Sequence, residues 1–182
     1  LHGGVLKAYG AHVYAVSPRE PDNPRVLLPI IKVYVNNVET CALLDPGSSI
    51  TLITDKLVKR LGLSGPKVDF SLQTVNAHGK MLSRLVTCEV RGYQETVTHV
   101  LSNCVSVPEL PAQNPEVAQR EVSSYEHLKG IPWSPARRSE VDLLIGQDHT
   151  HLLLTYEYKL GKRGEPVAVK TPLGWAIQGP MT

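Results

Sequence analysis

The chain has 182 residues, of which 42% are hydrophobic and only 5% aromatic, and its formal net charge is +2. This length corresponds to one ordinary domain, whose core must be built from Leu, Val and Ile. The basic residues are scattered, so we expect no direct nucleic-acid binding. No apolar run approaches the roughly 20 residues that span a bilayer, so we expect no membrane partner.

The cysteine count gives an expectation about the compartment. Cys41, Cys88 and Cys104 are an odd number and lack metal-ligand spacing. They favour a reduced, intracellular setting over a disulfide framework. Because the chain begins with Leu1 and shows no signal peptide, we expect a cytoplasmic fragment or product of a longer protein.

Short runs rich in Val, Ile and Thr predict a mainly β protein. Residues 1–25 are weakly patterned, and we interpret them as a lead-in to a single domain at 26–182. Residues 26–35 predict a strand, Asn36-Asn37 a turn, and residues 38–44 the returning strand.

The returning strand leads directly into Asp45. Leu43 and Leu44 are consecutive apolar residues, which predicts a strand buried on both faces. Pro46-Gly47 ends this strand, and Gly47 allows a close backbone approach that a side chain would forbid. A carboxylate at the lip of such a turn is held rigidly near apolar groups, where acid–base chemistry is easiest to arrange.

A short helix is predicted over residues 56–61, with Thr54-Asp55 as its cap and Gly62 as its end. A β-hairpin is predicted from residues 68–75 and 81–90. The polar tip between these strands, at 76–80, contains Ala77, His78 and Gly79. The simpler interpretation of His78 is a turn residue, and contact with a substrate is the alternative.

The second half of the chain begins with a Pro-rich stretch. We expect residues 105–138 to be a loop-rich insertion that decorates the core. Residues 141–145 predict a buried strand ending at Gly146, and residues 148–152 predict a short helix with Asp148 as a possible cap.

His149 and His151 lie in this predicted helix. They are two positions apart, which places them poorly for binding one ion from one helix face, and no cysteine or acidic cluster is nearby. We therefore expect no metal site and no cofactor. Residues 153–160 and 167–171 predict a final pair of strands around a basic turn.

Three segments of the sequence resemble a known family. Residues Leu43 to Ser49 form a hydrophobic-hydrophobic-Asp-x-Gly-Ser-Ser pattern similar to the catalytic loop of aspartic peptidases, and the match extends to Leu63. It returns at residues 141–149, which include the second hydrophobic-Gly motif, Leu144-Ile145-Gly146, and it closes at residues 171–180. Together these segments resemble the protease region of BEL/Pao-type retrotransposon polyproteins, of the single-lobed retropepsin type.

This resemblance implies a closed, retropepsin-like β-barrel with one or two short helices, in which the hairpin with its tip at 76–80 is the flap over a bound peptide. It also implies an aspartic endopeptidase that hydrolyses a retroelement polyprotein. Two carboxylates that share one proton can activate water and protonate the leaving amine, because like charges a few ångströms apart do not both ionise easily. Only one Asp-x-Gly is present, so we expect a symmetric homodimer with paired Asp45 carboxylates.

Pro46 departs from the family pattern, which usually has Ser or Thr at this position. That hydroxyl and its backbone N–H connect the two catalytic loops across the dimer axis, and proline offers neither group. By the same resemblance, Ser48 is expected to bond the outer oxygen of Asp45. The sequence leaves open a weak protease, a decayed transposon copy, or an inactive module that binds peptide or dimerises.

Overall fold

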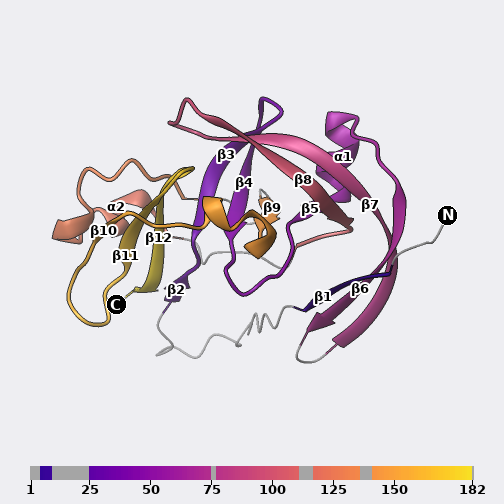
Figure 1. The fold of residues 1–182 in the computed structure, drawn as a ribbon. Coiled ribbons are helices and arrows are strands. Elements are labelled where there is room, and N and C mark those ends of the chain that lie inside the picture. The colour runs from indigo at the N-terminus through magenta and orange to yellow at the C-terminus, as the bar shows by residue number, and fades with distance from the viewer. Residues whose placement is uncertain (1–4, 10–24, 75–76, 111–116, 136–140, 182) are drawn as a thin grey trace.

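The computed structural model describes residues 5–9, 25–74, 77–110, 117–135 and 141–181, the side chains at 5–9, 73, 74 and 77 excepted. As predicted, the fold is mainly β, with few short helices (Figure 1). In chain order the elements are β1 Val5–Tyr9, β2 Arg25–Leu27, β3 Ile30–Val35, β4 Val38–Leu44, β5 Leu52–Thr54, α1 Asp55–Leu61, β6 Lys67–Thr74, β7 Ala77–Gly92, β8 Thr98–Val107, α2 Gln119–Val122, η1 Glu126–Leu128, β9 Val141–Ile145, η2 Gln147–Leu152, β10 Glu157–Lys159, β11 Val167–Thr171 and β12 Gly174–Met181.

Six strands close into a mixed β-barrel, which confirms the predicted fold class. The order is β3-β4-β9-β5-β8-β7, and β7 pairs back with β3. Strand β4 runs parallel to β9 and β5 runs parallel to β8, whereas the other neighbours are antiparallel. Closure leaves these six strands without a free edge along the ring, so their backbone groups pair within the barrel.

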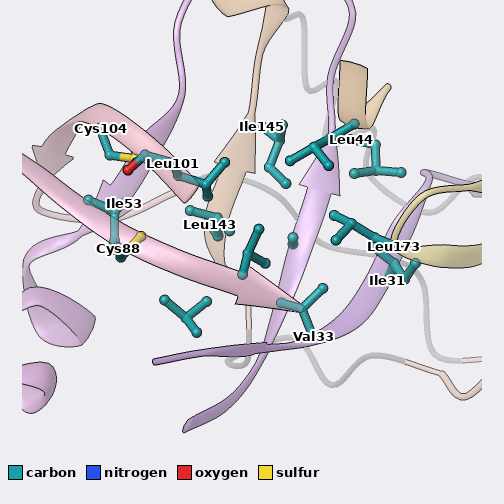
Figure 2. Packing of buried hydrophobic residues seen from close by; sticks show 14 of the residues in the cluster. Ile31, Val33, Leu44, Ile53, Cys88, Leu101, Cys104, Leu143, Ile145 and Leu173 are labelled. Atoms are coloured by element: carbon teal, nitrogen blue, oxygen red, sulfur yellow. The ribbon is translucent and has the colours of Figure 1, made fainter. Parts of the chain in front are cut away.

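Alternate residues of the barrel strands enter different hydrophobic clusters. The inner cluster draws on all six strands; Leu44, Leu143 and Ile145 belong to it (Figure 2). Leu43 and Leu144 instead belong to a second cluster on the opposite face of the same strands. The prediction that the strand before Asp45 is buried on both faces is therefore confirmed.

A smaller sheet, ordered β10-β11-β12-β2, lies beside the barrel (Figure 1). On β11, Val169 packs into the inner barrel cluster and Ala168 into a third cluster. Val122, Leu128 and Trp133 of the predicted insertion pack into that third cluster. Residues 117–135 of the predicted insertion therefore cover the face of this sheet that points away from the barrel.

Several predicted boundaries were wrong. One strand within residues 1–25, β1, was not predicted, and it pairs in parallel with β6. Residues 26–35 form two strands in different sheets, because Pro29 lacks the N–H that a continuous ladder needs. The strand predicted at 153–160 is only β10, Glu157–Lys159. Strand β8 continues to Val107, into the start of the predicted insertion.

The helix prediction at 56–61 is confirmed in detail. The hydroxyl of Thr54 accepts a hydrogen bond from the backbone N–H of Leu57 at 3.2 Å, and Gly62 ends α1 in the left-handed conformation, with φ 63°. No helix within the described residues combines the length and the apolar character that crossing a membrane requires.

Candidate active site

Asp45 lies immediately after β4 in a turn that orients its carboxylate. Its backbone N–H donates to the carbonyl of Ile145 at 2.9 Å, which extends the β4–β9 pairing by one residue. The N–H of Gly47 donates to Asp45 Oδ1 at 2.9 Å, and the N–H of Ser48 donates to the Asp45 carbonyl at 3.1 Å. Asp side chains commonly accept from the backbone two residues on in such turns. With 7% of its surface exposed, Asp45 is held nearly buried at the end of a rigid strand.

Gly146, in the second hydrophobic-Gly motif, lies directly against this loop. A Cβ atom there would stand 2.3 Å from the carbonyl oxygen of Ile50 and 2.9 Å from that of Ser48, closer than non-bonded atoms approach. Only glycine allows the two backbones to come this near. Leu144 and Ile145 precede it on β9, side by side with Leu43 and Leu44 of β4.

Gln147 connects the start of η2 to both ends of the turn. Its backbone N–H donates to the carbonyl of Ser48 at 2.8 Å, and its side-chain Nε2 donates to the carbonyl of Pro46 at 2.9 Å. Pro46 is exposed, and its carbonyl is used within the chain. The turn therefore has a defined conformation even though Pro46 has no N–H to donate.

A polar network that sequence analysis missed supports the far side of the loop. The hydroxyl of Thr51 donates to Asp148 Oδ1 at 2.7 Å, and its backbone N–H donates to Asp148 Oδ2 at 2.9 Å. The same hydroxyl accepts from the N–H of Gly146 at 3.2 Å. Asp148 thus bonds a residue 97 positions away, which no local pattern indicates.

His149 completes this network. Its Nε2 accepts the backbone N–H of Ser102 at 3.1 Å, so the proton of the neutral ring is on Nδ1. Nδ1 lies 2.8 Å from Thr51 Oγ1 and 3.1 Å from Asp148 Oδ1, and it donates in that direction. Because both ring nitrogens are engaged, His149 acts as a buried connection between β8 and the Asp45 loop.

Two other polar side chains near the loop have structural partners. The hydroxyl of Ser48 donates to the carbonyl of Ile50 at 2.8 Å, in place of the bond to Asp45 that the resemblance implies. The buried Asp142 accepts from the hydroxyls of Thr40 at 2.9 Å and Thr54 at 2.7 Å. These bonds give Asp142 a structural role, because they join β9 to β4 and β5.

The residues predicted for the flap lie in the hairpin formed by β6 and β7. The predicted tip at 76–80 was wrong: Ala77, His78 and Gly79 belong to β7, where they pair with residues 74, 73 and 72 of β6. His78 and Gly79 are exposed. The connection itself is residues 75–76, outside the described residues. The structure thus brings Leu144, Ile145 and Gly146 to the Asp45 loop, and it places the predicted flap residues on the β6–β7 hairpin, whose strand β7 continues into the barrel.

The sequence of residues 31–149 matches the aspartyl protease family. The chain belongs to that family. The matched segment begins in β3 and ends in η2, so it contains the Asp45 turn, Gly146 and the Asp148–His149 network. No curated protein matches the chain.

Proposed function

We propose that this aspartyl protease family member is an endopeptidase whose active form is a symmetric homodimer with paired Asp45 carboxylates. The observation that supports it is the Asp45 turn, in which a nearly buried carboxylate accepts from Gly47 and is fixed by β9 and η2. Positioning of this kind lowers the cost of reaching the transition state, because no further ordering of the base is required.

The proposed reaction needs the two carboxyl groups in different protonation states. The ionised carboxylate takes a proton from water while the water oxygen attacks the carbonyl carbon of the peptide bond. The protonated carboxyl group stabilises the developing oxyanion, and a proton passes to the leaving nitrogen as the C–N bond breaks. Because the two groups titrate as one coupled pair, the pH dependence of cleavage belongs to the pair and not to either residue alone.

The proposed substrate is a polypeptide, and more specifically the polyprotein of a BEL/Pao-type retroelement. This assignment depends on the three sequence segments that resemble that group, at residues 43–63, 141–149 and 171–180. We place the reaction inside the cell, on the polyprotein from which the domain comes. The three cysteines are buried and form no disulfide, which is consistent with a reducing compartment.

The alternative is a module that binds peptides or dimerises without cleaving them, and Pro46 favours it. A proline cannot donate the N–H that would join the two turns across a dimer axis. The loss of one hydrogen-bond partner at a buried contact costs about 1–3 kcal/mol. Both functions require the same fold, so they differ only in whether Asp45 catalyses hydrolysis.

The test is cleavage of a diverse pool of unstructured peptides between about pH 4 and 7. Asp45→Asn should lower cleavage by about 10²–10⁴-fold or more, because it removes the acid–base group. Asp55→Asn, at an exposed carboxylate in the first turn of α1, is the matched control and should cleave like the wild type. If the wild type binds these peptides but cleaves none, at concentrations that force dimers, the alternative is correct.

A further inference from the structure

An exposed apolar row follows η2. The exposed fractions of Leu154, Tyr156, Tyr158 and Leu160 are 60%, 62%, 53% and 68%. They alternate with Thr155, Glu157 and Lys159 along a segment that contains β10. Scattered exposed apolar residues are normal, but several gathered on one short segment are typical of an interaction surface.

The strand pairing shows which face this row continues. Tyr158 is opposite Val169 of β11, and directly opposed residues point to the same face of a sheet. Val169 packs into the inner barrel cluster. Tyr158 therefore lies on the barrel-side face of the small sheet, beyond the part of that face that the barrel covers.

The backbone of β10 is also available. Among the described residues, β10 pairs with β11 on one side only and forms an edge of the small sheet. An edge strand presents N–H and C=O groups that another strand can pair with. A lysine on such an edge normally opposes pairing, but here Lys159 has an acidic neighbour two residues away, Glu157.

The order of charges around Tyr158 is self-complementary. If two copies of β10 pair antiparallel about a two-fold axis at Tyr158, Glu157 of each copy is opposite Lys159 of the other. Tyr156 is then opposite Leu160 in the same way. Opposite charges directly across an antiparallel pair stabilise it, and like charges destabilise it. In the single chain Glu157 and Lys159 contact each other at 3.4 Å and are 45% and 46% exposed, so both can exchange partners.

We propose that the β10 edge is a self-association surface, at which β10 pairs antiparallel with β10 of a second copy of this chain in the register Tyr158 to Tyr158. The contact joins two four-stranded sheets into one and covers the apolar row on both copies. It is a second contact between copies, separate from the Asp45 homodimer of the proposed peptidase, because none of its residues belongs to the Asp45 turn.

Charge reversal tests the register. Glu157→Lys alone makes both cross-axis pairs Lys–Lys, and Lys159→Glu alone makes both Glu–Glu. Each should raise the Kd of the β10 contact, measured by sedimentation, by about tenfold or more at low salt. The double variant Glu157→Lys/Lys159→Glu reverses every pair and should restore the wild-type Kd to within about threefold.

Cross-linking tests the position of the axis. The native cysteines are buried, so an introduced surface thiol is the reactive one under mild oxidation with diamide. A residue on a two-fold axis meets its own copy, so Tyr158→Cys should form a covalent dimer rapidly. Leu82→Cys, at a position 65% exposed on β7, is the control and should cross-link only slowly.

Three results would overturn the proposal: a wild-type chain that stays monomeric at all concentrations, a double swap that does not recover what the single reversals lose, or equal cross-linking at the two positions. Asp45→Asn should leave the Kd unchanged. Self-association without cleavage would therefore count against the peptidase alone, and cleavage without a contact at β10 would count against this surface alone.

Discussion

Strands β9 and β10 show how differently two short strands of one molecule can be used. All five residues of β9 are buried, and the strand has β4 on one side and β5 on the other. All three residues of β10 are exposed, and its one described neighbour is β11. The Asp45 turn lies at the end of the buried pair, and the exposed strand carries the proposed contact surface. In these proposals, catalysis would depend on fixed backbone, whereas self-association would depend on backbone left unpaired at the sheet edge.

The largest expected effect is the difference in unfolding free energy between truncating a leucine on β9 and truncating one beside β10. Leu143→Ala on β9, where the side chain is fully buried, should lower the free energy of unfolding by about 2–5 kcal/mol, because it leaves a cavity in the barrel core. Leu160→Ala, just after β10, should change it by about 0.5 kcal/mol or less. Urea denaturation of both variants measures this, and equal losses would show that β10 is not exposed in the free chain.

A smaller difference in stability is expected between alanine substitutions at the two glycines that follow these strands. Gly146→Ala should cost about 1–3 kcal/mol, since the new methyl group meets the Ile50 carbonyl in the Asp45 loop. At Gly161 the three atoms nearest to a new methyl group belong to the side chains of His127 and Glu165 and not to the backbone, so they can shift more readily than a carbonyl of the loop. Gly161→Ala should therefore cost less than Gly146→Ala in thermal unfolding. The reverse order would mean that the loop is loosely held against β9.

The smallest effect concerns His99, which contacts the η2 segment that joins the two regions. Its pKa is lowered, first by burial and second by His151, whose ring centroid is 5.9 Å away. The folded chain binds a proton at His99 less readily than the unfolded chain does. Protonation of His99 therefore lowers the free energy of unfolding: there is no loss above the ordinary pKa of about 6.5, and stability is lost as the pH falls from there through the lowered value.

His99→Phe should therefore reduce the fall in Tm between pH 7.5 and 5. His151→Gln should reduce it less, because it removes only the second cause. A wild-type Tm that falls no more steeply than that of His99→Phe would contradict the assignment.

Local pattern was enough to predict several features of the fold and site. Consecutive Leu43 and Leu44 predicted burial on both faces, and Thr54 and Gly62 predicted the ends of α1. These succeeded because the period of apolar residues and the capping groups act within a few positions of one another. The boundary at Pro29 failed because proline interrupts the ladder, and the boundary at β10 failed because the apolar residues extend beyond the three positions that pair with β11.

The sequence by itself determined the type of protein, since the Asp45 motif, the motif that ends at Gly146 and the apolar periods each lie within a few consecutive residues. Only the tertiary structure decided what holds the site. Thr51 bonds to Asp148 across 97 positions and to His149 across 98, and the hydroxyl of Ser48 donates to the carbonyl of Ile50. Hydrogen bonds between distant residues depend on how the barrel closes, and no short window of sequence contains both partners.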